Sequence, residues 1–293
     1  MTKDDQNDKS ARDTHYATLR RQVRDAKRER GDIPTPQEKR RRSGGEWTPP
    51  KLAPEQVFLY GLHTVRAAID NPQRKLIKLS VTQNALARLD IGEAGALKFP
   101  VDMVSPQDID KVLGPDAIHQ GVMLETRPLP VRRLEGLKES PLLLVLDQVT
   151  DPHNVGAIMR SAVAFGAGAV ITTQRHSPTE SGVLAKSASG ALELIPYIQV
   201  TNLADALGEL HRLGFQTIGL DSEGPAPLEG TFDAAKVALV LGSEGKGLRQ
   251  KTRETVTSLA RLDMPGAIKS LNVSNAAAIA LYAARHHLAK NAD

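Results

Sequence analysis

The architecture of this chain follows from residues 142–160, which read Leu142-Leu-Leu-Val-Leu-Asp-Gln-Val-Thr-Asp-Pro-His-Asn-Val-Gly-Ala-Ile-Met-Arg160. The run begins with five consecutive apolar residues and continues with turn residues, which is typical of a strand covered on both faces in a parallel sheet. Asp151-Pro152 predicts a turn, and Asn154 is suited to cap a helix. Apolar residues then recur at helical spacing from Val155 onward. We therefore predict a strand, a polar loop and a helix.

The loop of this unit is a candidate binding site. In open parallel sheets, ligands bind beyond the carboxyl ends of the strands. Asn154 and Arg160 fall in that place. A plainer interpretation, a helix cap and a solvated arginine, fits the same residues, and this stretch alone favours it.

Strands and helices continue to alternate along the rest of the chain. Such alternation predicts an α/β fold with a parallel sheet and helices on both of its faces. The candidate strands are residues 142–147, 169–173, 195–200, 216–220, 237–241 and 258–264, and the candidate helices are residues 155–166, 182–190, 203–213 and 273–289.

The preceding part of the chain reads as a separate small domain. Residues 54–127 predict a small α/β domain, with one helix after Gly61 and another that begins at Ser105-Pro106. No catalytic constellation is visible in it. Residues 128–140 are rich in proline and charge, which is typical of a linker between domains.

The first 53 residues are expected to form a disordered basic tail. Of the 38 Lys and Arg and 34 Asp and Glu in the chain, residues 1–50 hold 13 and 9, so they carry the whole net charge of +4. Such a segment buries too little apolar surface to offset the entropy of ordering it. It would either contact nucleic-acid phosphates or only keep the protein soluble, and the sequence leaves both open.

The composition excludes several kinds of site. The chain has 293 residues, 40% of them hydrophobic but only 3% aromatic, so the core must be aliphatic. Because cysteine is absent, there is no disulfide, thiolate-bound zinc or thiol nucleophile, which fits the reducing cytoplasm, our expected location. The eight histidines show no ligand spacing, so no metal is expected. No apolar run reaches the length of a membrane span, so no membrane association is expected either.

Two further stretches place polar residues at strand ends. The first reads Leu241-Gly-Ser-Glu-Gly-Lys-Gly-Leu248, and its glycines would let the backbone approach a ligand closely beside the carboxylate of Glu244. Its spacing matches neither the dinucleotide fingerprint nor the P-loop. In the second, Ser270 and Asn272 precede a long alanine-rich helix, which either of them could cap.

Taken together, three stretches resemble the motifs of the SpoU (TrmH) RNA ribose methyltransferases, a family of the SPOUT superfamily. Asn154–Arg160, Leu241–Leu248 and Ser270–Ser274 match the first, second and third motifs in order and spacing. The match defines a catalytic domain over residues 141–293. Residues 54–127 also resemble the substrate-binding domain of members that act on ribosomal RNA, whereas the basic tail has no counterpart. One local departure is the reading Leu-Asp-Met-Pro-Gly from Leu262, where many members have proline directly after the aliphatic residue.

The resemblance implies a fold and a chemistry that spacing cannot reveal. It implies a trefoil knot in the C-terminal part of the sheet, S-adenosylmethionine bound in that knot, a homodimer, and methyl transfer to a ribose 2′-hydroxyl of RNA. By position, the implied cofactor-binding residues are Gly242, Leu262 and Leu271, and the implied reaction centre is Asn154, Arg160, Glu244, Ser270 and Asn272.

The two-domain layout makes a guanosine of large-subunit ribosomal RNA the expected substrate, with transfer RNA as the alternative. Two alternatives come from other classes. A nucleotide-dependent oxidoreductase is disfavoured by the missing dinucleotide fingerprint. A non-catalytic RNA-binding protein stays open.

Overall fold

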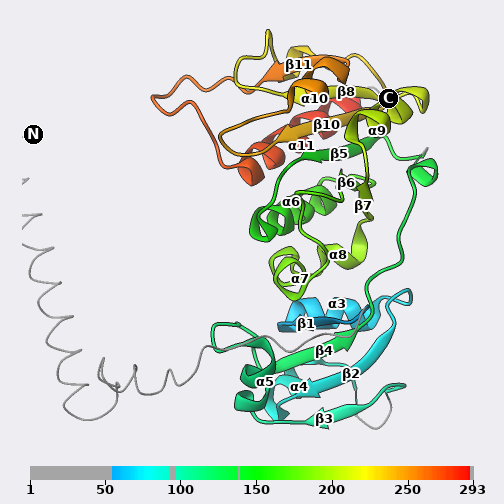
Figure 1. The fold of residues 1–293 in the computed structure, drawn as a ribbon, viewed down its shortest axis with the longest axis vertical. Coiled ribbons are helices and arrows are strands. Elements are labelled where there is room, and N and C mark those ends of the chain that lie inside the picture. Colours follow the sequence, from blue (N-terminus) through cyan, green and yellow to red (C-terminus); the bar gives the residue numbers. More distant parts are fainter. Residues whose placement is uncertain (1–54, 93–96, 138, 291–293) are drawn as a thin grey trace, which may run out of the picture. The chain divides into compact units, whose positions relative to one another are not determined.

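The computed structural model describes residues 55–92, 97–137 and 139–290, and the expected tail over residues 1–53 lies outside them. The described residues form two β-sheets, each covered by helices (Figure 1). One sheet belongs to the expected small domain, and the other follows residue 141.

The small sheet has four strands in the order β1-β4-β2-β3. Strands β2 and β3 run parallel, and the other pairs are antiparallel. The predicted helix start at Ser105-Pro106 is confirmed, because Ser105 and Asp108 form a reciprocal capping box. The strands are β1 (Val57–Tyr60), β2 (Leu76–Val81), β3 (Val101–Met103) and β4 (Val122–Thr126), and the helices are α3 (Leu62–Asp70), α4 (Gln83–Leu89) and α5 (Pro106–Leu113).

The large sheet has seven strands in the order β7-β6-β5-β10-β8-β11-β9, and every neighbouring pair is parallel. The parallel α/β prediction is therefore confirmed. The last predicted strand is shorter than expected, because it ends at Arg261 rather than at residue 264. The strands are β5 (Leu142–Asp147), β6 (Val170–Thr173), β7 (Tyr197–Val200), β8 (Gln216–Leu220), β9 (Ala226–Pro227), β10 (Val237–Gly242) and β11 (Ser258–Arg261).

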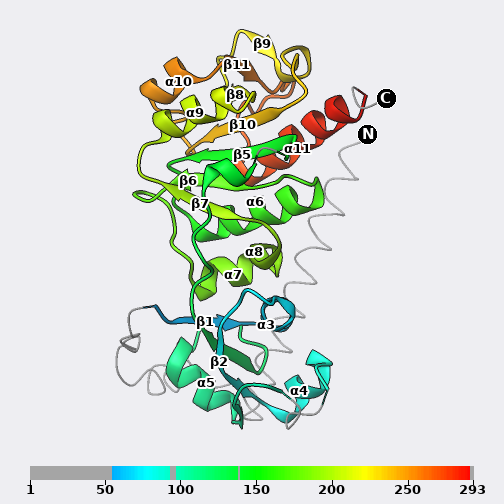
Figure 2. The same ribbon diagram turned by 90° about the vertical axis from the view of Figure 1, so that its right-hand side faces the viewer.

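Helices cover both faces of the large sheet (Figure 2). Helices α6 and α11 pack on one face, with α7 packed against α6 and β1, and α9 packs with the 3-10 helix η2 on the other face. The segment expected to be a linker contributes η2, whose Leu134 and Leu137 are buried in the core. The helices are α6 (Pro152–Ala164), α7 (Gly182–Ala188), α8 (Ala191–Leu194), α9 (Leu203–Arg212), α10 (Gln250–Thr255) and α11 (Val273–Lys290), with the 3-10 helices η2 (Leu134–Leu137) and η3 (Leu228–Gly230).

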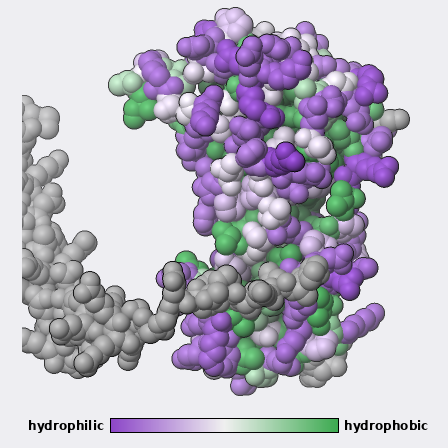
Figure 3. Space-filling model, viewed as in Figure 1, coloured by the Kyte–Doolittle hydropathy of each residue, from purple (hydrophilic) through white to green (hydrophobic). Residues whose placement is uncertain are grey.

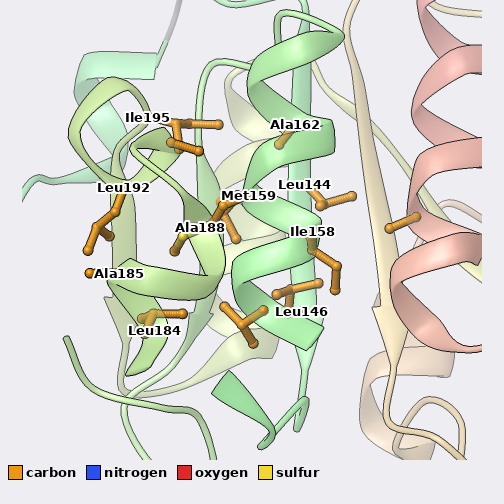
Figure 4. Close-up of a cluster of buried hydrophobic side chains, with 14 of the residues drawn as sticks. Leu144, Leu146, Ile158, Met159, Ala162, Leu184, Ala185, Ala188, Leu192 and Ile195 are labelled. Carbon is orange, nitrogen blue, oxygen red and sulfur yellow. The ribbon is translucent and has the colours of Figure 1, made fainter. Parts of the chain in front are cut away.

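Strand β5 explains why the opening apolar run is unbroken. Leu142, Leu144 and Leu146 enter the core under α6 and α11, whereas Leu143 and Val145 enter the core under α9. All five side chains have no exposed surface. Because successive side chains of a strand point to opposite faces, a strand covered on both sides must be apolar at each position. Figure 4 shows Leu144 and Leu146 packed against the inner side of α6.

The start of α6 corrects one prediction. The helix begins at Pro152, and the Asp151 side chain caps it by accepting from the amide of His153 at 2.9 Å. The capping role predicted for Asn154 is therefore wrong. Asn154 lies inside the first turn, so its side chain is available for another partner.

A buried ion cluster joins Arg74, in the turn before β2, to Glu180, in the loop before α7, and to Glu193 of α8. The Arg74 guanidinium has no exposed surface and pairs with Glu180 and Glu193. Its Nε lies 3.2 Å from an oxygen of Glu193. A buried arginine is tolerated only with such partners.

The surface seen in Figure 3 is mostly hydrophilic, with scattered hydrophobic residues. Within the described ranges, none of the helices combines the length and apolar character needed to cross a membrane.

Candidate active site

Three loops meet beyond the carboxyl ends of β5 and β10, and Glu244 is their meeting point. Its Oε1 accepts three hydrogen bonds, from Asn272 Nδ2 at 2.8 Å, Asn154 Nδ2 at 3.1 Å and the amide of Val273 at 3.2 Å. Asn272 Nδ2 also donates to Asn154 Oδ1 at 3.0 Å. The three polar residues expected from three separate motifs thus form one hydrogen-bonded cluster.

Asn272 has two roles in this cluster. Its Oδ1 accepts from the amide of Ser274 at 2.8 Å, at the start of α11. The predicted capping role of Asn272 is therefore confirmed. Its Nδ2 remains free to donate toward Glu244 and Asn154, so the start of α11 is fixed to the other two loops.

A cavity of about 270 Å³ lies beside the cluster. It is lined by all three residues expected to bind a cofactor, Gly242, Leu262 and Leu271. Glu244 and Ser270 line it as well, so the cavity opens next to the polar cluster. Leu271 lines this cavity and is 41% exposed.

The glycine loop folds back on itself. Ser243 and Gly247 form an isolated antiparallel bridge, and Gly245 and Gly247 have φ of 78° and 65°, which favours glycine. A Cβ on Gly242 would lie 2.1 Å from the backbone carbon of Gly247. Gly242 is thus required by the loop itself, before any ligand is considered.

Two of the expected site residues stand apart from the cluster. Arg160 lies in the second half of α6 with an exposed side chain, and within the part of the chain described here it has no hydrogen bond or ion pair. Six residues separate it from Asn154, which places the two side chains about 120° apart around the helix. Ser270 is exposed at the cavity and has no hydrogen bond to any described residue.

The structure adds functional candidates that the motifs did not indicate. Asp147 ends β5 with a fully buried carboxylate, which accepts from Arg249. Asp221 follows β8, lines the cavity and pairs with Arg253. Both are acidic residues at the carboxyl end of a strand of the parallel sheet, and this position was the signal that could have identified them.

His153 lies beside the cluster on the first turn of α6, and its Nδ1 lies 3.0 Å from the Ser187 hydroxyl. Among the described residues, no group of three or more His, Asp and Glu side chains is arranged to hold a metal ion.

Two family models match the chain. The model of the SpoU rRNA Methylase family matches residues 141–282. The model of the RNA 2′-O ribose methyltransferase substrate binding domain matches residues 58–131.

Curated relatives match most of the chain. The 23S rRNA (guanosine-2′-O-)-methyltransferase RlmB of Ralstonia nicotianae is 39% identical over 238 residues, which cover 78% of this chain and 94% of that protein. The protein of the same name from Pseudomonas aeruginosa is 37% identical, with coverage of 76% and 94%.

Solved structures have the same fold. The AdoMet-bound rRNA methyltransferase from Sinorhizobium meliloti is 25% identical, with a TM-score of 0.67 and coverage of 80% of this chain and 88% of that chain. The SpoU methyltransferase AviRb from Streptomyces viridochromogenes is 20% identical, with a TM-score of 0.69 and coverage of 81% and 91%, and it supports the fold alone.

Proposed function

The chain belongs to the SpoU rRNA methylase family, and on that premise we propose that it methylates the ribose 2′-hydroxyl of a guanosine in 23S ribosomal RNA, with S-adenosylmethionine as methyl donor. The observation that carries the proposal is the convergence of Asn154, Glu244 and Asn272 beside the cavity. The two curated relatives described above bear the name of this activity and are covered over 94% of their length.

The cavity fits the proposed cofactor. Its volume of about 270 Å³ is close to the lower end of the range that holds small ligands. Leu262 and Leu271 supply an apolar wall for a flat base, and the glycine loop supplies backbone polar groups that side chains do not screen. When bound, S-adenosylmethionine supplies an electrophilic methyl group on a positively charged sulfur.

The residues of the cluster orient the reacting groups and take no part in making or breaking bonds. Glu244 holds the side-chain amides of Asn154 and Asn272 in a fixed relation, and Ser270 presents a free hydroxyl at the edge of the cavity for the ribose. Such preorganisation can account for much of the rate of a transfer between two bound groups.

We assign Arg160 to the RNA rather than to proton removal. A guanidinium stays protonated in proteins, so it donates hydrogen bonds and does not act as a base. Arg160 would hold a phosphate and stabilise the negative charge that develops on the 2′-oxygen, while the proton leaves to water.

The position of Arg160 supports a homodimer. Within one chain its side chain projects away from Asn154, and α11, which packs against α6, exposes Ile279 and Tyr282 by 45% and 63%. Exposed apolar residues of this size are typical of interfaces. We propose that two copies pair over this surface, so that Arg160 of each copy reaches the cluster of the other.

The chain path supports the trefoil knot. After β8, residues 221–236 pass to the far side of β11, where β9 pairs with it, and then return to β10. After β11 the chain must come back past this loop, because α11 packs against β10 and α6. We propose that this crossing threads the loop.

The remaining assignments follow from the substrate. We propose that residues 54–127 bind RNA, that residues 128–140 connect them to a catalytic domain over residues 141–293, and that the protein acts in the cytoplasm, where ribosomal RNA is made.

A methyl-transfer assay tests the function. The purified full-length protein is titrated with S-adenosylmethionine and with NAD, then incubated with 23S ribosomal RNA and with transfer RNA, and 2′-O-methyl positions are mapped. Methylation of one 23S guanosine is the expected result. Methylation of transfer RNA alone would refute the substrate, and RNA binding without transfer would make the protein a non-catalytic binder.

A further inference from the structure

Asp147 holds a carboxylate in the core directly under the glycine loop. Its side chain has no exposed surface, yet both oxygens are bonded to one residue. Oδ2 accepts from the Arg249 amide at 3.0 Å, and Oδ1 accepts from Arg249 Nε at 2.6 Å. A carboxylate is costly to bury unless its oxygens are paired, so these two bonds decide where Arg249 can lie.

The same aspartate also adjoins the start of the glycine loop. In the parallel ladder of β5 and β10, Asp147 lies opposite Gly242, the last residue of β10. Arg249 is the residue at which the loop ends and α10 begins. Asp147 therefore fixes the start of the loop through strand pairing and its end through the side chain.

The middle of the loop is fixed from the same segment. Glu244 accepts from Asn154, which lies seven residues after Asp147. The glycine loop, residues 242–249, is thus attached to residues 147–154 at its start, middle and end. If its end were released, the strand pairing at Gly242 would still fix the start of the loop, but the position of Glu244 would depend on the Ser243–Gly247 bridge and on its own hydrogen bonds to Asn154 and the start of α11.

We propose that Asp147 and Arg249 are positioning residues for methyl transfer, which act by fixing the glycine loop so that Glu244 aligns Asn154 and Asn272. The inference rests on the proposed function for its kinetic consequence. Neither residue touches the substrate in this role.

Asp147→Asn is the informative change because it keeps the size of the side chain. An amide has one acceptor oxygen, so one of the two Arg249 donors meets an NH₂ group. The positive charge of Arg249 remains available to RNA. The single-turnover rate at saturating S-adenosylmethionine should fall by about 10- to 100-fold, the scale expected when reacting groups are displaced by about 1 Å.

Two controls separate positioning from stability and from RNA binding. Ile198→Ala removes a buried side chain on β7, which β6 and β5 separate from β10 in the sheet, and should destabilise the fold while leaving the rate unchanged. RNA affinity of Asp147→Asn should stay within about twofold of wild type, because no phosphate contact is removed. A wild-type rate in Asp147→Asn, or an equal rate loss in Ile198→Ala, would overturn the proposal.

Hydrogen exchange tests the same idea without any activity. In the full-length protein without RNA or cofactor, Asp147→Asn should raise amide exchange over residues 242–249 about tenfold and leave β8 unchanged. Unchanged exchange in the loop would refute the positioning role. If the wild-type protein methylated no RNA, the proposed function would fail, and the exchange experiment would still decide whether Asp147 fixes the loop.

Discussion

Replacing Glu244 with alanine removes one oxygen that accepts from Asn272, Asn154 and the Val273 amide, at 2.8, 3.1 and 3.2 Å. Glu244 and Asn272 are exposed, so water replaces most of the lost bonds, and the free energy of unfolding should fall by only about 1 kcal/mol. The effect on methyl transfer should be much larger. Once both asparagine amides are released, a displacement of about 1 Å would lower the rate about 100-fold, or about 2.7 kcal/mol in the barrier.

Glu244→Gln should cause a smaller loss of the methyl-transfer rate than Glu244→Ala. Glutamine keeps one acceptor oxygen for the three donors but loses the negative charge, and hydrogen bonds to charged groups are roughly twice as strong as neutral ones. We expect a rate between those of wild type and Glu244→Ala.

The assay is single-turnover methylation of 23S ribosomal RNA at saturating S-adenosylmethionine, beside a thermal melt and a cofactor titration. The matched control is Glu254→Ala, an exposed glutamate on α10 that bonds to Gln250 and lies outside the cluster. It should transfer at the wild-type rate. A folded, cofactor-saturated Glu244→Ala protein within about threefold of wild type would refute the role of the cluster.

Four further experiments test the remaining assignments. Arg160→Lys keeps the charge but loses the planar guanidinium, so the rate of methyl transfer should fall by about 100-fold with cofactor binding intact. Normal turnover would mean that Arg160 is only a solvated residue on the surface of α6. Mixing Arg160→Ala and Glu244→Ala chains should restore about a quarter of wild-type activity if each site uses both copies, and none if each site is built from one chain. Gly242→Ala should weaken cofactor binding and lower the melting temperature, because its Cβ meets the Gly247 backbone; unchanged binding would contradict the cavity assignment. Deleting residues 1–50 should flatten the dependence of RNA affinity on salt while the same nucleotide is methylated, and an unchanged slope would make the tail a solubiliser.

Periodicity along the chain was enough to predict the sheet and most of its helices. The run Leu142–Leu146 has to be apolar throughout because both faces of the strand are covered. Each of its positions is therefore an apolar residue, which can be read directly from the sequence. The start of α5 was equally readable, since a capping box is complete within four residues. The resemblance of the three motifs to the SpoU family also pointed to Glu244, to Asn272 and to the leucines that line the cavity.

Which of these groups contact one another was decided only by the tertiary structure. Strand order sets β10 between β5 and β8, so Gly242 lies beside Asp147 and the Arg249 side chain reaches a carboxylate 102 residues away. Asn154 looked like a helix cap because local sequence cannot reveal a partner in another loop, here Glu244, 90 residues along the chain. Local patterns record which face of an element is buried, whereas the partner of an exposed polar side chain depends on which strands become neighbours.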